Sequence, residues 1–145
     1  MNVQVALPPR LAEIVDDFSL AEGREKLEML LQFSDSLPPV PEWLKGNEDE
    51  MESVPECMTP VSVAAEVKEG GMVYHFIVPP ESPTVRGYAA ILAEGLRGVP
   101  PEEVLNLPTE FYLQMGLQQV LTSQRLNGMA ALVAHVKRLA LEHIK

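Results

Sequence analysis

The chain has 145 residues, of which 46% are hydrophobic and 22% charged, as in one globular domain that buries its own core, and this excludes an intrinsically disordered chain. Its formal net charge of −10 disfavours nucleic acid and anionic membrane surfaces as partners, because both present negative phosphates. A basic protein surface is the partner that such a charge favours.

Cys57 is the only cysteine, so no internal disulfide can form, and no cluster of cysteines and histidines has the spacing of a zinc site. A lone thiol suits a reducing compartment. The N-terminus lacks the basic region and apolar run of a secretory signal, and no apolar run approaches the roughly 20 residues that span a bilayer. We therefore expect a cytoplasmic protein with no metal and no other cofactor.

Two helices are expected in the N-terminal part, after a loosely held arm over residues 1–9. Apolar residues at helical spacing predict the first helix, which has Pro9 near its start: Leu11, Ile14, Val15 and Phe18. Ser19 and Glu22 have the spacing of a capping box, so the second helix should begin there. Its expected buried stripe is Leu27, Leu30, Leu31 and Ser34, with Lys26 among the charged residues of the other face. Pro38-Pro39 should end this helix.

Residues 38–55 are polar, acidic and irregular, which is typical of a solvated surface loop. The alternative is a mobile cover or docking segment for the thiol, because long loops in compact domains are often functional.

A small antiparallel sheet is expected next. Alternation over residues 61–67 predicts a strand with one buried face, and the β-branched and aromatic residues over 72–78 predict its partner. Lys68-Glu69-Gly70-Gly71 is typical of the hairpin turn between them. Because a two-stranded sheet is marginal by itself, we expect a third strand over residues 51–54.

The C-terminal half is predicted to be helical, which makes the fold class α+β. Ser82 and Pro83 are typical of a helix start, and Val85, Ala89, Leu92 and Leu96 would form its buried face. Short helices are expected over residues 101–105 and 109–115. A long C-terminal helix, capped by Thr122 or Ser123, follows the i, i+3, i+4 rule to Ala140.

Cys57 lies between the acidic stretch and the strand over residues 61–67. Most lone cysteines are small half-buried apolar residues, and that is the plain interpretation of this one. The other interpretation is a reactive thiol carried at a loop tip.

Four segments, in order, resemble the SufE family of sulfur-acceptor proteins that work with cysteine desulfurases in iron–sulfur cluster assembly. Val54 to Val61, with Ser62 after it, is similar to the family's cysteine loop, roughly Val-x-Gly-Cys-Gln-Ser-x-Val-Trp. Four positions differ from that pattern: Glu56 replaces the glycine, Met58 replaces the glutamine, Thr59 replaces the serine and Ser62 replaces the tryptophan. The other three segments are Leu37-Pro38-Pro39-Val40-Pro41, Val85-Arg86-Gly87 and the run from Leu121 to Met129.

The resemblance covers about residues 10–143. It implies one SufE-like domain over residues 1–145, of the SufE/IscU-like fold: a three-stranded antiparallel sheet packed against helices, with a long C-terminal helix. It further implies that Cys57 takes sulfane sulfur as a persulfide from a SufS-like cysteine desulfurase, stimulates that enzyme and passes sulfur to an Fe–S scaffold complex. The chain would then be a sulfur carrier and desulfurase activator rather than a stand-alone enzyme.

Arg125 and Glu56 are the expected supporting residues. Arg125 corresponds to the arginine that the family places near its cysteine loop, where it would favour the thiolate. A plain ion pair at a helix end is its alternative role. Glu56 should disfavour the thiolate and lacks the backbone freedom of glycine, but pairing with Arg125 would offset its charge.

Two other functions stay open. Glu56 and Met58 are compatible with an interaction module that docks on a desulfurase without carrying sulfur. A Cys–His hydrolase or transferase would use His75, although nothing else completes a catalytic set, so a solvent-facing strand histidine is the simpler interpretation. Trp43 and Met58 are candidate apolar contacts for a partner, and ordinary loop packing is the alternative for Trp43.

Overall fold

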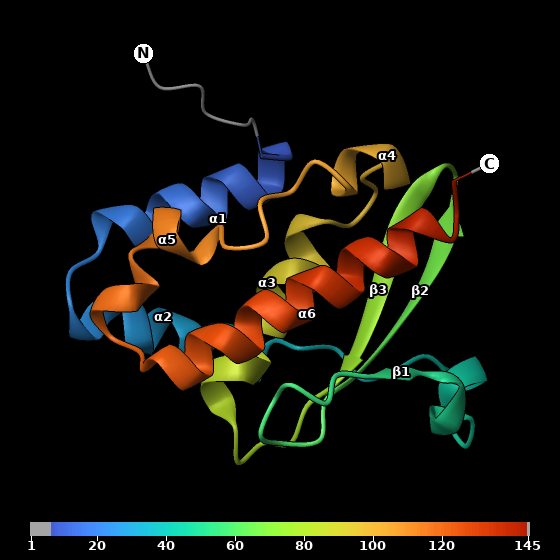
Figure 1. The fold of residues 1–145 in the computed structure, drawn as a ribbon, viewed down its shortest axis with the longest axis horizontal. Helices are drawn as coiled ribbons and strands as arrows, with labels where there is room; N and C mark the ends of the chain where they lie inside the picture. Colours follow the sequence, from blue (N-terminus) through green and yellow to red (C-terminus); the bar gives the residue numbers. More distant parts are fainter. Residues whose placement is uncertain (1–6, 145) are drawn as a thin grey trace.

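The computed structural model describes residues 7–144. In chain order the elements are α1 (Pro9–Leu20), α2 (Arg24–Asp35), the 3₁₀ turns η1 (Glu42–Leu44) and η2 (Glu48–Glu50), β1 (Glu52–Ser53), β2 (Ser62–Lys68), β3 (Gly71–Ile77), α3 (Pro83–Gly95), α4 (Pro101–Val104), α5 (Tyr112–Met115), η3 (Leu117–Gln119) and α6 (Ser123–Leu141) (Figure 1).

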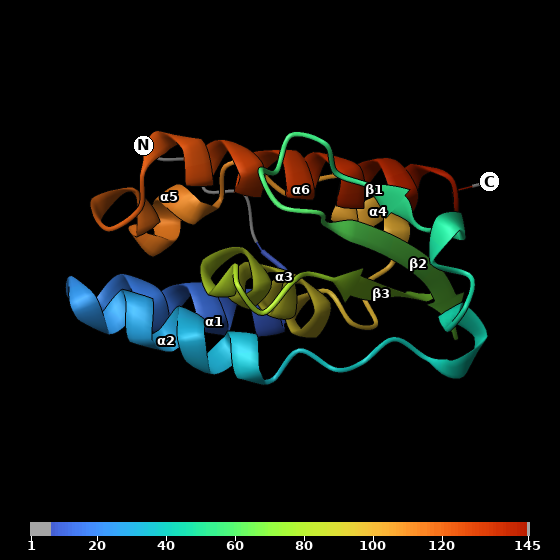
Figure 2. The same cartoon turned by 90° about the horizontal axis from the view of Figure 1, so that it is seen from below.

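The elements form three layers (Figure 2). Helix α6 lies on one side with α4 and α5, helices α1 and α2 lie on the other, and α3 and the sheet lie between them. Because α3 is covered from both sides, it is buried almost all round rather than along one stripe. A Cβ on Gly87 would lie 2.2 Å from the Leu30 carbonyl oxygen, so this glycine lets the α2 and α3 backbones approach closely.

The sheet has the antiparallel strand order β1-β2-β3. Glu69 and Gly70 form the two-residue turn between β2 and β3 with φ values of 52° and 82°, the backbone that matches the twist of a hairpin. The short strand β1 pairs with the start of β2, which confirms the expected third strand. The predicted α+β class, with a three-stranded antiparallel sheet packed on helices, is therefore confirmed.

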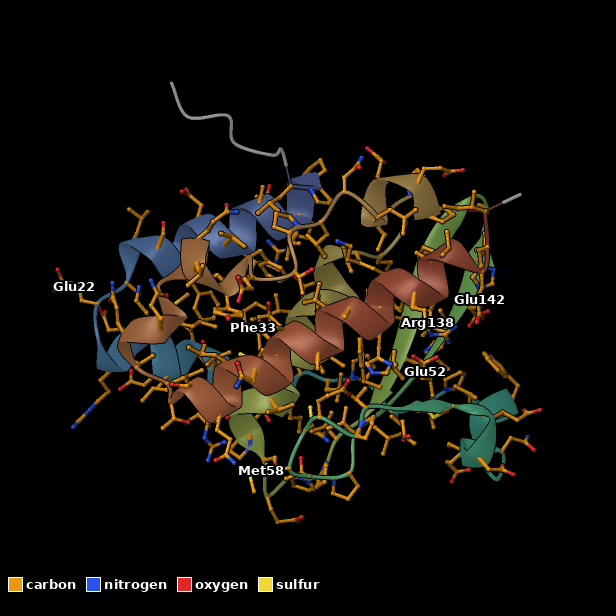
Figure 3. The ribbon with its side chains drawn as sticks, in the orientation of Figure 1. Glu22, Phe33, Glu52, Met58, Arg138 and Glu142 are labelled. Atoms are coloured by element: carbon orange, nitrogen blue, oxygen red, sulfur yellow. The ribbon has the colours of Figure 1, made fainter. Side chains whose placement is uncertain are left out.

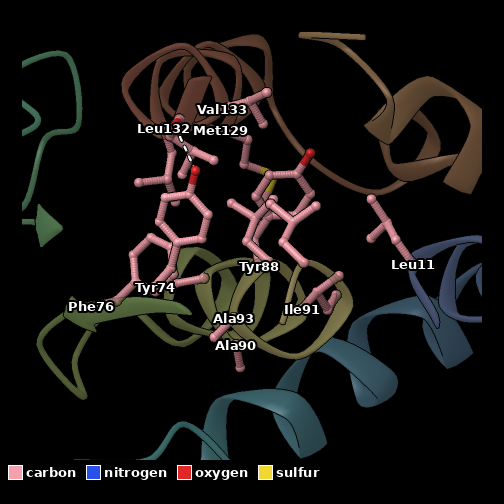
Figure 4. Close-up of a cluster of buried hydrophobic side chains, with 14 of the residues drawn as sticks. Leu11, Tyr74, Phe76, Tyr88, Ala90, Ile91, Ala93, Met129, Leu132 and Val133 are labelled. Atoms are coloured by element: carbon pink, nitrogen blue, oxygen red, sulfur yellow. Dashed lines mark hydrogen bonds between the residues drawn. The ribbon is translucent and has the colours of Figure 1, made fainter. Parts of the chain in front are cut away.

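The core joins the sheet and α3 to α6 (Figure 4). Tyr74 of β3 donates a hydrogen bond of 2.8 Å to the Val136 carbonyl oxygen of α6. On α3, Tyr88 stacks against Phe111 with the two ring centroids 5.3 Å apart. The first contact ties α6 to β3, and the second ties α3 to the segment before α5.

The predicted start of the second helix is wrong. Helix α1 continues to Leu20, so the Ser19 hydroxyl donates to the Asp16 carbonyl inside α1 rather than capping α2. The cap of α2 is Gly23, whose φ is 48°.

The predicted faces of α2 are also partly wrong. Leu31, expected inside, is exposed, whereas Lys26 is only 2% exposed. The Lys26 ammonium donates to the carbonyl oxygens of Phe18 and Ala21 at 2.6 and 2.7 Å, where the end of α1 leaves acceptors without helical partners.

Of the arm predicted over residues 1–9, residues 1–6 lie outside the described part, and Pro9 is already the first residue of α1. Within residues 7–144, no helix is both long and apolar enough to cross a membrane.

Candidate functional site

The cysteine is carried by a closed loop over residues 54–61, between β1 and β2 (Figure 1). The Val54 N–H donates to the Val61 carbonyl at 2.9 Å and closes the base of this loop. At the tip, the Cys57 N–H donates to the Val54 carbonyl at 3.2 Å, which forms a turn with Pro55 and Glu56 at its centre. Glu56 has negative φ, so the glycine of the family pattern is not required for this conformation.

The thiol is tucked against α6 and is only 8% exposed. Its Sγ lies 3.5 Å from the Gly128 carbonyl oxygen, at the distance of a weak S–H hydrogen bond. A Cβ on Gly128 would lie 3.4 Å from Sγ, at ordinary van der Waals contact, so the backbone of α6 passes directly beside the sulfur. In the sequence, Gly128 belongs to a segment that resembles the family, but nothing there assigned it a role beside the thiol.

A cavity of about 430 Å³ opens beside the thiol. Its lining comes from the cysteine loop, the start of α3 and the first turns of α6. The lining residues are Cys57, Met58, Thr59, Glu81, Ser82, Val85, Thr122, Gln124, Arg125 and Gly128. The loop and the first turns of α6, the two segments that resemble the SufE family around Cys57 and Arg125, therefore meet at one cavity.

The environment of the thiol opposes ionisation. Burial raises the pKa of Cys57 to about 11, and the negative charge of Glu56 adds to the effect. On the order of one such thiol in three thousand is ionised at pH 7.5, since each pKa unit changes the ratio tenfold. In this closed position the thiol is therefore protonated and is a poor nucleophile.

Arg125 lines the same cavity but does not pair with Glu56. Its Nη1 donates to the Thr84 hydroxyl at 2.9 Å, and its backbone N–H donates to Thr122 Oγ1 at 3.4 Å, the N-cap bond of α6. The Arg125–Glu56 pairing expected from the sequence is wrong, whereas the expected cap at Thr122 is confirmed.

Glu56 instead pairs with His135 of α6, whose Nε2 is 3.2 Å from Glu56 Oε1. His135 Nδ1 contacts Glu52 of β1, and Arg138 Nε donates to the same Glu52 carboxylate at 3.1 Å. Figure 3 shows Glu52 and Arg138 side by side at the edge of α6. We call Glu52, Glu56, His135 and Arg138 the α6 clasp.

Two hydrogen bonds favour the charged form of Glu56. A bond from its own backbone N–H and the bond from His135 lower the pKa of the Glu56 carboxyl. Neither His135 nor Glu52 was predicted as a site residue, because they lie 79 and 83 positions apart from their partners Glu56 and His135 in the chain.

The remaining candidates lie elsewhere or at the rim. His75 is half-buried on β3, with Nε2 2.7 Å from Glu66 Oε2, and it does not line the cavity of Cys57. Trp43 contacts the His75 ring edge-on, so it packs on the sheet while staying 48% exposed. Met58, beside the thiol, is 77% exposed at the loop tip (Figure 3). Of these candidates, only Met58 therefore presents an apolar surface next to the sulfur.

Comparison with known structures shows the same fold elsewhere. The solution structure of a hypothetical protein from Thermus thermophilus superposes with a TM-score of 0.83 at 34% identity, over 94% of this chain and 97% of the other.

Related sequences give the same result. A SufE-like protein of Mycobacterium tuberculosis is 41% identical over 139 residues, which cover 95% of this chain and 96% of the relative. A Plasmodium vivax protein named cysteine desulfuration protein SufE is 28% identical over 90% of this chain and 52% of its own length. The model of the SufE family, described as an Fe-S metabolism associated domain, matches residues 12–140. On these matches and on its fold, the chain belongs to the SufE family.

Proposed function

We propose that this protein is a sulfur acceptor that receives sulfane sulfur on Cys57 from a SufS-like cysteine desulfurase and passes it on for iron–sulfur cluster assembly. The observation that carries the proposal is a lone thiol, held in a loop over a cavity with Arg125, in a chain of the SufE family. The name of the Plasmodium vivax relative, cysteine desulfuration protein, supports the same activity.

The transfer is a thiol exchange. The Cys57 thiolate attacks the outer sulfur of the donor persulfide, and a new S–S bond forms as the donor S–S bond breaks. The electron pair leaves with the donor cysteine, which becomes a thiolate, and the transferred sulfur stays on Cys57 with its proton. No electrons are gained or lost overall, so the step needs no redox cofactor.

The closed loop cannot perform this step, because Cys57 is buried and protonated there. Docking on the desulfurase must therefore move the loop outward, and the exposed Met58 is placed to make the first apolar contact. Arg125 on the cavity wall supplies a positive charge that favours the sulfur anion when the loaded loop closes. Stimulation of the desulfurase follows, because removing the persulfide frees its cysteine for another turnover.

The direct test is intact-mass analysis after incubation with a desulfurase and cysteine. We expect a gain of about 32 Da, one sulfur atom, that reductant removes. Cys57→Ser is the matched control and should show no gain. The proposal is wrong if Cys57 stays unmodified in a complex that demonstrably forms.

The second candidate is a docking module that binds the desulfurase without carrying sulfur. The raised pKa of Cys57, to which the Glu56 charge contributes, favours it. Unmodified Cys57 in a stable complex is the result that this candidate predicts. In either case we propose a cytoplasmic location, which rests on the lone unpaired thiol of the sequence.

A further inference from the structure

Two buried side-chain hydroxyls in the described residues 7–144 have no hydrogen-bond partner: Thr59 Oγ1 and the Tyr88 hydroxyl. Burying a hydroxyl without a partner costs free energy, because the water that it loses is not replaced. Each such group in a folded protein therefore calls for an explanation.

The two hydroxyls have different surroundings. Tyr88 lies in the core of α3, fully buried and stacked on Phe111, and it does not line the cavity beside the thiol (Figure 4). Thr59 follows Cys57 by two residues in the same loop, and both residues line that cavity. A smaller hollow of about 250 Å³ on the loop has Cys57 and Thr59 in its lining as well. Thr59 and Cys57 therefore share the lining of two hollows.

A negatively charged sulfur in this cavity needs a hydrogen-bond donor. Once Cys57 is ionised or carries a persulfide, a negative charge lies in a site where burial and Glu56 both oppose it. Arg125 is exposed and has one of its nitrogens bonded to Thr84. A hydroxyl shielded from water stabilises an anion more than an exposed one does, because the local dielectric is low.

We propose that Thr59 is a positioning residue whose hydroxyl donates a hydrogen bond to the sulfur anion of Cys57 in its thiolate and persulfide forms. The hydroxyl lacks a partner in the resting thiol form and gains one when charge appears on the sulfur. The persulfide part of this inference rests on the proposed sulfur-acceptor function, whereas the thiolate part does not.

The test compares Thr59→Val, which removes the hydroxyl at nearly constant shape, with Thr59→Ser, which keeps it. Tyr88→Phe is the matched control, because it removes the other unpartnered hydroxyl away from the site. For each protein, the rate of Cys57 alkylation is measured against pH, together with the thermal midpoint of unfolding and the half-life of the persulfide after loading.

In Thr59→Val we expect the alkylation profile to move upward by roughly one pH unit and the persulfide half-life to shorten, while the thermal midpoint stays equal or rises. Thr59→Ser should keep the wild-type profile. Tyr88→Phe should share the stability effect but leave the profile unchanged. A change in the thermal midpoint alone would mean a purely structural role for Thr59.

Superimposable alkylation profiles of wild type and Thr59→Val would overturn the proposal. So would a Thr59→Ser profile that shifts as far as that of Thr59→Val, because the hydroxyl would then not be the cause. If wild type takes up no sulfur but Thr59→Val still shifts the profile, the sulfur-acceptor function fails while the role of Thr59 at the thiolate stands.

Discussion

At the scale of single residues, the surroundings of Cys57 in the fold shift the pKa of its thiol away from that of a free cysteine. Burial is the larger cause of the raised pKa of Cys57, and Glu56 adds a negative charge beside the thiol. The sequence indicates the effect of Glu56 correctly, because it depends only on adjacency. It does not indicate the partner of Glu56, because His135 is 79 positions away and reaches the loop only through the packing of α6 on the sheet.

Glu56→Gln should lower the pKa of Cys57 below about 11 but leave it above the ordinary 9.0, because burial is the larger cause. The alkylation rate of Cys57 at pH 8 should rise several-fold, since the lower pKa leaves more thiolate, and the midpoint of the pH profile separates this effect from any loop opening. Glu102→Gln on α4, which removes a charge far from the cavity, should match wild type. Equal rates in all three proteins would show that the Glu56 charge does not act on the sulfur.

The same shift has a consequence for stability. The folded chain holds the Cys57 proton more tightly than the unfolded chain, whose thiol titrates near 9.0. This contribution of the raised pKa to the free energy of unfolding is complete below pH 9 and is lost as pH rises towards 11. Glu56→Gln should lose less over that window, as urea unfolding at a series of pH values would measure.

At the scale of elements, α6 is the scaffold of the site. It carries the side chains and backbone groups that contact the cysteine loop and β1 or line the cavity: Arg125, Gly128, His135 and Arg138. The apolar periodicity of this helix and its cap at Thr122 are local signals, so both are predictable from the sequence. The start of α2 and the burial of Lys26 were not predicted correctly from the sequence. Lys26 is buried because its ammonium donates to carbonyls at the end of another helix. Periodicity within one helix contains no information about acceptors at the end of its neighbour.

His135→Ala should loosen the cysteine loop by removing the side chain that joins Glu52 and Glu56. We expect the plateau rate of Cys57 alkylation at high pH to rise by up to about tenfold, because bonds to charged groups that hold the loop closed are lost. The plateau reports loop opening, whereas the midpoint of the profile reports the pKa.

His143→Ala is the matched control, since His143 is an exposed histidine just beyond the end of α6. An unchanged plateau in His135→Ala would show that the clasp does not limit access to the thiol.

At the scale of the whole molecule, the fold was the most predictable feature. The hairpin and the helical C-terminal half have local signals, and the third strand was expected because two strands alone are marginal; the structure confirms all three. The outward face of the molecule is acidic, with a net charge of −10 and exposed carboxylates at Glu42, Glu48, Asp49 and Glu50.

Because charges of opposite sign steer encounter, association with the proposed desulfurase partner should slow as salt rises. Stopped-flow measurement over a range of ionic strength should give a rate that falls at least several-fold between low and physiological salt. Cys57→Ser should show the same salt dependence, since the thiol is buried and contributes no charge to the encounter. A rate independent of ionic strength would exclude electrostatic steering by the acidic surface.

The two attachments of the cysteine loop lie apart along α6. Gly128, beside the sulfur, and His135, in the clasp, are seven positions apart, which is about 10 Å along a helix that rises about 1.5 Å per residue. The loop is thus held at two places: the Cys57 sulfur contacts the Gly128 carbonyl, and Glu56 pairs with His135 of the clasp. A partner that brings an arginine or lysine to Glu56 can replace the bond from His135 without contacting the sulfur. A small oxidant carries no such group, so it reaches the sulfur only when the loop opens by itself, which the bonds of the clasp oppose.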